Sequence, residues 1–424
     1  MQKTNFNFMK IGIQTWGSNG DIRPMIALAG GLRQAGHTVT LCVCSIDNRS
    51  DADLCRTLSI PYRRVPEHVD FDMPAFAQKT FRMNTLQWLR ALLDEVFFPY
   101  EMEIYQASRQ LAAEQDLLIG HHFLYPLKLA AHKQQKPHIS VTFCHAAIPV
   151  SSEPPFRFPK LGGLLNRLQW KIMQQIFDFS LKQRLSKLWK MEGVGEIRHV
   201  FPDLLSSDLL NLVAVDPVFC REHVQWPSLH KACGFLNLPE DAESWLMPAA
   251  LNHFMADGEP PVYLTFGSLQ QAVPDWSMEL FIEAVRLTGC RAIIQTASAH
   301  YAEHSIQGEI YFIGRHPHHE VFKRCAAVVH HGGAGTTHAA TLSGCPSIVV
   351  PFMDEQLFWG CQLQQLGIAG IPLPARTVNA KTLAVAITKV LNSPNMQTTA
   401  SQLSKKLRSH NGVLQAVNFV EKSI

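Results

Sequence analysis

The chain has 424 residues, 46% of them hydrophobic and 17% charged, and its formal net charge is +3. This length is too great for a single hydrophobic core, so two domains are expected, and the composition excludes a disordered chain. The small net charge gives no support for a nucleic-acid partner, and we expect none. The ten cysteines include no C-x-x-C pair, which favours a reducing compartment, so we expect a cytoplasmic protein.

No part of the sequence is typical of a membrane-spanning segment. Uninterrupted apolar runs stay well below the ~18 residues that a spanning helix needs, and the N-terminal segment lacks the apolar stretch of a signal peptide. Any contact with a membrane is therefore expected to be peripheral.

Strands and helices alternate through the first half of the chain. Residues 10–15 form an apolar strand, a polar glycine-containing turn follows, and residues 25–35 form a helix before the next strand at 38–44. Such a βαβ unit predicts a parallel sheet with right-handed crossovers. The pattern continues to residues 210–215, expected to be the last strand of an N-terminal domain that spans residues 1–238.

A long amphipathic segment is inserted in this domain at about 160–190. Apolar residues recur there at spacings of three and four, which marks one face of a helix: Leu161, Leu165, Leu168, Ile172, Ile176 and Phe179. Two interpretations stay open. The segment is either a helix packed on its domain or a flap that lines an apolar acceptor site or rests on a membrane surface. Under the second, Ile172 and Ile176 are candidates for contacts with the acceptor.

Residues 239–261 are rich in proline and show no strand pattern, so they are interpreted as an interdomain linker. Strands and helices alternate again through residues 262–405, and a final helix at 406–424 is expected to pack back toward the N-terminal domain. The predicted fold class is α/β, with two doubly wound parallel-sheet domains.

The most informative stretch is residues 326–360. A short apolar strand is followed by HHGGAGTT at 330–337 and then by helix-forming residues. A helix N-terminus behind such a loop offers free N–H groups and the positive end of a dipole, which suit a phosphate or diphosphate. The glycines let the backbone approach the anion. The loop matches neither a P-loop nor G-x-G-x-x-G.

The motif H-x-G-G-x-G-T is followed by G-x-P, P-F and the acidic-Gln pair Glu355-Gln356. This arrangement resembles the nucleotide-sugar signature of inverting glycosyltransferases with the GT-B fold. The ending EQLFWG is most similar to the branch that includes sterol glucosyltransferases and antibiotic and glycolipid glycosyltransferases. The resemblance spans almost the whole chain. It implies two Rossmann-like domains that face a cleft, with the donor mainly on the C-terminal domain and the acceptor on the N-terminal one.

The resemblance also implies a donor site that needs no metal. His331 would contact the diphosphate, and Glu355 with Gln356 would hold sugar hydroxyls. The family has aspartate where this chain has Glu355. This difference leaves open whether the donor sugar is glucose, but a hexose is still expected. Arg315 replaces the tryptophan that stacks on the base in plant members, which leaves the nucleotide open. The implied donor-binding residues are Ser268, His316, His318, His331, Gly333, Ala334, Gly335, Thr336, Glu355 and Gln356.

Asp21 lies in the sequence Gly20-Asp21-Ile22-Arg23-Pro24. Plant relatives carry their catalytic histidine at this turn, and the sterol and antibiotic branch carries aspartate. The resemblance therefore implies that Asp21 removes the proton of the acceptor hydroxyl. A lone aspartate in such a turn would instead be interpreted as a cap of the following helix.

Several histidines need a separate interpretation. Those at positions 316, 318, 319, 330 and 331 suggest a metal site, but their spacing does not bring three or four ligands together as zinc requires. We expect no metal and no other cofactor. Candidates for acceptor contacts at strand ends of the N-terminal sheet, for which a structural role is an equal alternative, are Trp16, His121, His122 and His145.

These features together predict an inverting, metal-independent hexosyltransferase. It would use a nucleotide-sugar donor, UDP-glucose first, and a hydrophobic acceptor such as a sterol or another lipid. One alternative is transfer from a dTDP- or UDP-sugar to a polyketide or a hydroxy fatty acid. A nucleotide-sugar epimerase is disfavoured by the acidic-Gln pair and the apolar helix. A non-catalytic accessory protein of the same fold is disfavoured by the presence of both Asp21 and His331.

Overall fold

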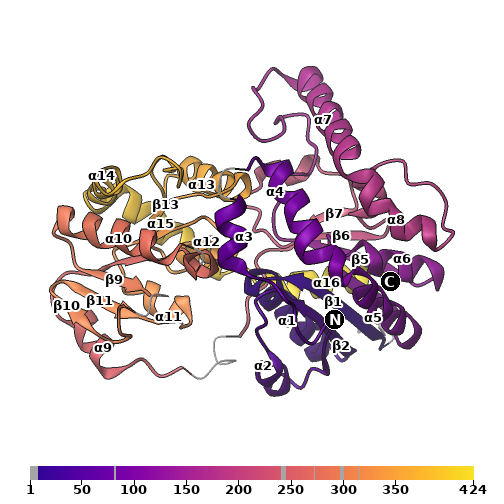
Figure 1. The fold of residues 1–424 in the computed structure, drawn as a ribbon, viewed down its shortest axis with the longest axis horizontal. Coiled ribbons are helices and arrows are strands. Elements are labelled where there is room, and N and C mark those ends of the chain that lie inside the picture. The colour runs from indigo at the N-terminus through magenta and orange to yellow at the C-terminus, as the bar shows by residue number, and fades with distance from the viewer. Residues whose placement is uncertain (1–7, 81–82, 240–244, 272, 297–299, 315) are drawn as a thin grey trace. The chain divides into compact units, whose positions relative to one another are not determined.

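The computed structural model describes residues 8–80, 83–239, 245–271, 273–296, 300–314 and 316–424. The chain forms two compact units (Figure 1). The first unit contains residues 1–71, 86–243 and 411–424, and the second contains residues 72–85 and 244–410.

The first unit is built on a seven-stranded sheet with the order β3-β2-β1-β4-β5-β6-β7, parallel throughout. Its order reverses between β1 and β4, which is the place where doubly wound sheets bind ligands at the carboxyl ends of their strands. The strands are β1 (Lys10–Gly17), β2 (Thr38–Ser45), β3 (Tyr62–Arg64), β4 (Leu117–His121), β5 (His138–Thr142), β6 (Leu210–Val213) and β7 (His230–Ala232).

The expectation that residues 210–215 form the last strand of this sheet is wrong, because β7 follows at the edge. Its three residues are at most half-buried, so they carry no apolar pattern that the sequence could reveal.

The helices of the first unit cover both faces of its sheet. They are α1 (Asn19–Gln34), α2 (Ala52–Thr57), α4 (Thr85–Leu92), α5 (Glu101–Glu114), α6 (Tyr125–Lys133), α7 (Gly163–Phe177), α8 (Gln183–Met191) and α16 (Gly412–Ser423). Helix α1 begins earlier than the predicted residue 25, because Pro24 is accommodated inside it at the loss of one intrahelical hydrogen bond. Asp21 therefore lies in the first turn of a helix and not in a loop.

Helix α16 brings the end of the chain into the first unit. Ala416, Val417 and Val420 are buried in the same core as α1, and a Cβ at Gly31 of α1 would lie 2.2 Å from Val413. The glycine thus allows the two helices to approach closely. The predicted final helix, 406–424, is in fact two: α15 (Pro394–Arg408) ends in the second unit, and Asn411 caps α16 by accepting from the Leu414 N–H at 2.9 Å.

The second unit has a six-stranded sheet with the order β10-β11-β9-β8-β12-β13, in which only the β10–β11 pair is antiparallel among the described strands. The order reverses between β8 and β12. The strands are β8 (Val262–Leu264), β9 (Ala292–Gln295), β10 (Ile306–Gln307), β11 (Ile310–Ile313), β12 (Ala327–His330) and β13 (Ser347–Val349). The helices are α3 (Met73–Thr80), α9 (Ala249–Ala256), α10 (Pro274–Thr288), α11 (His318–Phe322), α12 (Ala334–Leu342), α13 (Asp354–Gln365), α14 (Ala380–Leu391) and α15.

The borders of the second unit differ from the predicted ones in two places. The predicted linker at 239–261 contains α9, whose Leu251, Phe254 and Met255 are buried in the core of this unit. Residues 72–85, predicted to belong to the N-terminal domain, also belong here. Both errors arise because short segments acquire their partners only through tertiary packing. Within the described part of the chain, no helix has both the length and the apolar character required to cross a bilayer.

Candidate active site

Asp21 lies at the switch point of the first sheet, directly after β1. Its Oδ2 accepts hydrogen bonds from the N–H of Ser18 at 2.8 Å and from the Ser18 hydroxyl at 3.2 Å. A Cβ at Gly17, where φ is +135°, would lie 2.3 Å from the same oxygen, so a glycine is needed for the carboxylate to fold back there. The alternative interpretation of Asp21 as a cap of the following helix is therefore also correct, because its side chain bonds to Ser18 at the start of α1. This contact occupies only one of the two carboxylate oxygens.

The other oxygen of Asp21 faces His121, which ends the neighbouring strand β4. The Nδ1 atom of His121 accepts from the Phe123 N–H at 3.3 Å, so a neutral ring carries its proton on Nε2. That nitrogen lies 3.7 Å from Asp21 Oδ1. Burial, with a contribution from His122, lowers the pKa of His121 well below its ordinary value. His121 thus presents a neutral N–H toward the carboxylate.

The electrostatic surroundings make Asp21 a stronger base than an ordinary aspartate. Burial, and to a smaller extent the charge of Asp47, raise the pKa of Asp21 to about 6, against the lowering effect of the Ser18 hydrogen bonds. A carboxylate with this pKa is mostly ionised at neutral pH but holds a captured proton more firmly. Its side chain is 34% exposed, so a hydroxyl group can reach it.

Aromatic rings surround this position. Trp16 packs edge-on against Phe97 with the ring centroids 5.3 Å apart, and it also contacts Phe123. His121 and His122 lie 4.4 Å apart between centroids. Sequence reasoning missed Phe97 and Phe123, although Phe123 follows β4 directly and its place after a strand end was a usable signal. The cluster gives the carboxyl ends of β1 and β4 an apolar border.

The other predicted acceptor residues lie elsewhere in the first unit. His145 is mostly buried, its ring is 6.1 Å from Trp226, and burial lowers its pKa to about 4. Ile172 and Ile176 are on α7, whose main contacts are with residues 178–182 and 200–204. The prediction that these three residues contact an acceptor stays a prediction.

In the second unit, β12 runs into an uncapped helix N-terminus. Gly333 is the N-cap of α12 and offers no side chain to its first turn, which contains Ala334, Gly335 and Thr336. The first intrahelical bond is donated by Thr337 to Gly333 at 2.9 Å, so the preceding N–H groups point out of the helix end. A Cβ at Gly335 would meet nothing within 4 Å. This end of α12 is therefore an accessible site for an anion.

His331 stands beside that helix end. Its side chain is 9% exposed, and its Nδ1 has no hydrogen-bond partner among the described residues. A Cβ at Gly333 would lie 2.3 Å from its Nε2 and one at Gly267 would lie 3.1 Å from its Cε1, so the ring fits between two glycines at the β8–β12 switch point. Burial lowers the pKa of His331 to about 4. The ring is neutral, and its buried Nδ1 has hydrogen-bonding capacity that no described residue uses.

The start of α13 adjoins the same loop. A Cβ at Gly332, where φ is +87°, would lie 2.6 Å from the backbone oxygen of Gln356. The Gln356 side chain is mostly buried, and its Oε1 accepts from the Phe352 N–H at 2.8 Å. We expected this amide both to donate and to accept. Because the side-chain oxygen of Gln356 is already bonded, the residue can offer a ligand its side-chain N–H groups as hydrogen-bond donors. The exposed carboxylate of Glu355 can accept hydrogen bonds.

The remaining predicted donor residues lie on neighbouring segments of this unit. Ser268 is in the 3-10 turn that follows β8. His316 is bonded to a backbone carbonyl, and burial lowers its pKa to about 4. His318 begins α11 with its ring stacked on Phe322 at 4.8 Å. Arg315, which stands where plant members carry the base-stacking tryptophan, lies outside the described residues.

A segment without any motif also borders this loop. Helix α3 packs on the 3-10 turn of Ser268, the Thr85 hydroxyl donates to the Asp354 carboxylate, and Arg376 donates to the Met83 carbonyl at 2.7 Å. Sequence reasoning missed residues 72–85 because nothing in their composition points to a ligand. The hydrogen bond from Thr85 holds the carboxylate of Asp354, which directly precedes the Glu355-Gln356 pair.

The histidines of this unit do not assemble into a metal site in the described ranges. No group of three or more His, Cys, Asp or Glu side chains is placed there to hold an ion, and His330 Nδ1 accepts from the Gly332 N–H at 3.1 Å. The expectation that catalysis needs no metal stays a prediction.

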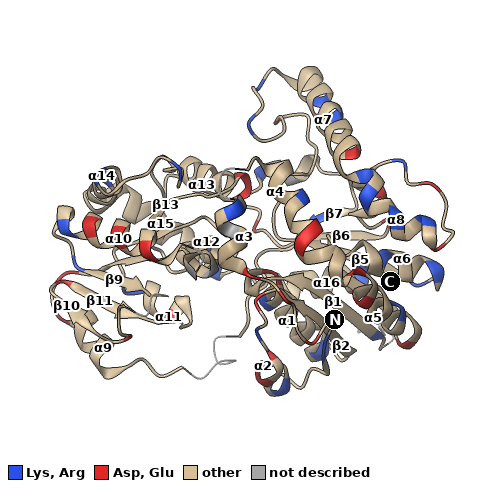
Figure 2. Ribbon diagram, in the orientation of Figure 1, with Lys and Arg blue, Asp and Glu red and all other residues tan. Residues whose placement is uncertain are grey.

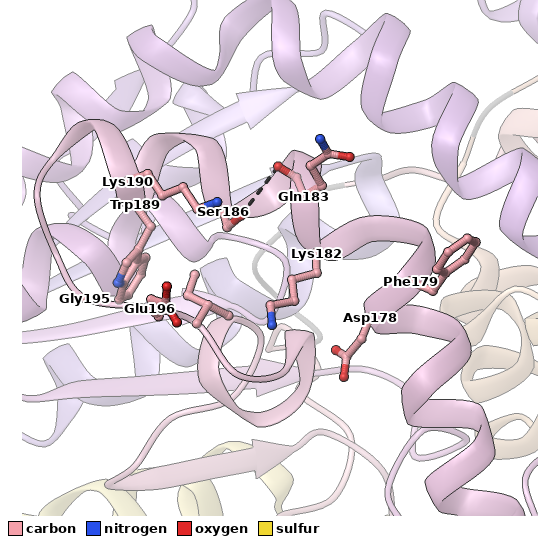
Figure 3. Close-up of a pocket in the computed structure, with 10 residues that line it drawn as sticks. Asp178, Phe179, Lys182, Gln183, Ser186, Trp189, Lys190, Gly195 and Glu196 are labelled. Carbon is pink, nitrogen blue, oxygen red and sulfur yellow. Dashed lines mark hydrogen bonds between the residues drawn. The ribbon is translucent and has the colours of Figure 1, made fainter.

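A hollow of about 320 Å³ lies at the junction of α7 and α8 (Figure 3). Its lining mixes charged residues such as Asp178, Lys182 and Glu196 with the apolar Trp189 and Ile197. It contains neither Asp21 nor a residue of the α12 loop, and we assign it no ligand.

Comparisons with known proteins add to this geometry. Residues 282–415 match the family described as "Erythromycin biosynthesis protein CIII-like, C-terminal domain". Over 98% of its length the chain is 26% identical to O-mycaminosyltylonolide 6-deoxyallosyltransferase of Streptomyces fradiae, of which it covers 97%. It is 27% identical, again over 98% of its length, to the sterol 3-beta-glucosyltransferase of Debaryomyces hansenii. It spans only 27% of that protein's length.

Solved structures share the fold of this chain. The glycotransferase of kitacinnamycin aligns with a TM-score of 0.71 at 18% identity, covering 99% of each chain. The glycosyltransferase VinC in complex with dTDP aligns with a TM-score of 0.64 at 18% identity, covering 97% of this chain and 99% of that one. The predicted fold class, two doubly wound α/β domains of the GT-B type, is confirmed.

Proposed function

Sequence, fold and relatives support a glycosyltransferase with the GT-B fold, and on that premise we propose that this protein transfers a hexose from a nucleotide sugar to a hydroxyl group of a hydrophobic acceptor, with inversion and without a metal. UDP-glucose is the first donor to test, and a sterol or another lipid is the first acceptor.

One observation carries the donor part of the proposal. The N-terminus of α12 is uncapped, and beside it stands a neutral, buried His331 with a nitrogen that has no partner among the described residues. A nucleoside diphosphate gains negative charge as it leaves the sugar. Preorganised N–H donors and the positive end of a helix dipole stabilise such charge where it develops.

The reaction follows from these groups in one displacement. The acceptor oxygen attacks the anomeric carbon as the bond between that carbon and the diphosphate oxygen breaks. Asp21 Oδ1 takes the proton of the acceptor hydroxyl, and the diphosphate leaves with the electron pair. Because attack comes from the side opposite the leaving group, the configuration at the anomeric carbon is inverted.

His121 faces Asp21 from the side opposite Ser18. Its Nε2 lies 3.7 Å from Asp21 Oδ1, beyond hydrogen-bond distance, while Ser18 holds Oδ2. The neutral ring adds no positive charge that would lower the pKa of the base.

The aromatic border around Asp21 supports an apolar acceptor, because flat rings and chains bind such surfaces with few polar contacts. A sterol acceptor is consistent with the named activity of the D. hansenii relative. The alternative is a polyketide acceptor with a dTDP-sugar as donor. The S. fradiae relative is named for transfer to O-mycaminosyltylonolide, and the VinC structure contains dTDP. A catalytically inactive accessory protein is the non-enzyme alternative.

A donor-by-acceptor screen tests the proposal directly. The protein is incubated with UDP- and dTDP-hexoses, each with a sterol, a hydroxy fatty acid and a macrolide aglycone, and products are followed by mass spectrometry. A glycosylated sterol or lipid supports the proposal, and a glycosylated macrolide selects the alternative. If neither transfer nor slow donor hydrolysis occurs with any donor, the accessory-protein alternative is favoured.

We expect the pH dependence of kcat/KM to show an acid limb near pH 6. The base works only when deprotonated, so activity falls as the pH decreases through the pKa of about 6 that burial gives Asp21. Ser18→Ala removes a hydroxyl that stabilises the ionised form, so it should move the limb to higher pH. A limb at the ordinary aspartate value, about 4, in both proteins would contradict the assignment.

Glu355→Ala is expected to separate sugar recognition from nucleotide recognition. Activity with the native donor should fall far more than the affinity for free UDP, because free UDP carries no hexose for the carboxylate to hold. The matched control is Asp354→Asn, which alters the adjacent carboxylate that Thr85 engages. Equal losses of activity and UDP affinity in Glu355→Ala would mean that Glu355 is structural.

A further inference from the structure

Helix α7 is attached to the first unit through a side that mixes polar and aromatic residues. The residues that it buries are Asn166 and Gln169. Asn166 Nδ2 donates to the Ser151 carbonyl at 3.0 Å, and Gln169 Nε2 donates to the Pro159 carbonyl at 3.1 Å. The Trp170 indole also donates to a backbone carbonyl of this proline-rich loop. Trp170 and Phe177 on this side are half-buried, and Phe177 packs edge-on against Phe201. One part of the apolar surface of α7 therefore faces its unit, and another part is left outside.

The opposite side of α7 is apolar and exposed. Leu164 is 82% exposed and Leu168 is 52% exposed, and Phe179, just beyond the helix, is 91% exposed. We call this surface the apolar stripe; it consists of Leu161, Leu164, Leu165, Leu168, Ile172 and Phe179. In Figure 1, α7 stands away from the sheet of its own unit, and in Figure 3 the Phe179 ring projects apart from the other side chains drawn. A contiguous apolar surface of this kind marks an interaction site.

Cationic side chains border the stripe. Arg167 and Lys171, both exposed, are one helical turn apart at its edge, and Figure 2 shows the blue bands on α7. No Asp or Glu occurs between residues 163 and 177. The exposed Arg157 lies shortly before the helix, and Lys160 in the same loop is paired with Glu153.

We propose that the apolar stripe docks on an anionic lipid bilayer, with α7 lying along the surface, its leucines among the acyl chains and its cations at the headgroups. An exposed apolar face with basic residues at its edge is the arrangement that binds the interface of a bilayer. A second copy of this chain fits less well, because its α7 would bring the same cations and no carboxylate to neutralise them. The inference deepens the proposed function by naming the surface from which a lipid acceptor would be taken.

Vesicle binding tests this without any turnover. The 424-residue chain is sedimented with vesicles of phosphatidylcholine alone and with vesicles that also contain about 30% phosphatidylserine. We expect binding to the anionic vesicles that weakens as salt is added, because headgroup attraction is screened. Arg167→Gln/Lys171→Gln should lower the partition coefficient by about 30-fold, since each cation near the surface contributes about one kcal/mol.

Leu164→Glu/Leu168→Glu should abolish binding to both kinds of vesicle. Both leucine side chains are exposed, so we expect the variant to fold as the wild type does. Circular dichroism checks that its helix content is unchanged. The matched control is Leu287→Glu/Val385→Glu, which makes the same charge change at exposed positions of α10 and α14 and should bind vesicles as the wild type does.

The result that overturns the inference is a wild type that binds neither vesicle, or a Leu164→Glu/Leu168→Glu variant that binds as well as the wild type. A concentration-dependent dimer that this variant abolishes, without vesicle binding, would assign the stripe to a second copy and also overturn it. The outcome is separable from the proposed function. Vesicle binding with transfer only to macrolides would reject the lipid acceptor alone, and transfer to a detergent-dispersed lipid without vesicle binding would reject the docking alone.

Discussion

Asp21→Asn is expected to lower turnover by about 10²–10⁴-fold, which is the usual contribution of a general base, while donor affinity stays close to that of the wild type. The amide oxygen of asparagine can still accept from the Ser18 N–H that now reaches Oδ2 at 2.8 Å, so the start of α1 is preserved. What the variant loses is the ability to take a proton. The measurement is the steady-state rate with the best donor and acceptor, together with UDP binding by calorimetry.

Thermal unfolding separates this loss from damage to the fold. The pKa of Asp21 is about 6 in the folded chain, whereas an unperturbed aspartate, as in the unfolded chain, has a pKa of 3.8. The folded state therefore binds the proton more strongly. Stability therefore decreases as the pH rises between these two values and stays at the lower level above them. At pH 8 asparagine removes this unfavourable charge, so the variant should unfold at the wild-type temperature or above it. If Asp21→Asn kept more than half of the wild-type turnover, Asp21 would be only a helix cap.

His331→Ala is expected to reduce kcat/KM by about 10²–10³-fold, the typical effect of removing one preorganised donor from a developing negative charge. Binding of UDP should weaken as well, and Thr336→Ala should have a smaller effect in the same direction. Because the α12 N-terminus supplies the positive potential itself, EDTA should not inhibit. A strict requirement for Mg²⁺ or Mn²⁺ would show that the diphosphate is neutralised in another way.

A pair of glycine variants tests the position of this histidine independently. A Cβ at Gly333 would lie 2.3 Å from His331 Nε2, whereas one at Gly370 would meet nothing within 4 Å. Gly333→Ala should therefore reproduce much of the His331→Ala defect by displacing the ring, and Gly370→Ala should behave as the wild type. Wild-type activity in Gly333→Ala would mean that the ring position is unimportant.

The sequence predicted the parts of the fold that repeat a local pattern. Buried strands such as β1 and β12 are apolar runs, and the glycines between β12 and α12 mark a turn that few other residues can form. The switch-point positions of Asp21 and His331 follow from those strands and from the family motif. The hydroxyl-bearing Ser18 and the glycine at position 17 that hold the carboxylate were not recognised, because their value depends on where the side chain of Asp21 folds.

Other features were beyond a local pattern. The periodicity of α7 identifies an apolar face but does not say which way it points, and the side that the helix turns to its unit holds the buried Asn166 and Gln169 beside the half-buried Phe177. The partner of that side is a loop several residues earlier in the chain. The pairing of His121 with Asp21 likewise joins residues that are distant in sequence, and no spacing rule predicts it.

Because the chain passes between the two units more than once, neither unit corresponds to one continuous fragment. The chain changes unit near residues 71–72, 85–86, 243–244 and 410–411. A fragment that began at residue 244 would lack the segment that engages Asp354 and Arg376. It would also keep α16, whose Val417 and Val420 belong in the core of the other unit. Neither half can therefore be produced intact by a single cut, and a nicked chain should survive only as a complementing pair of fragments.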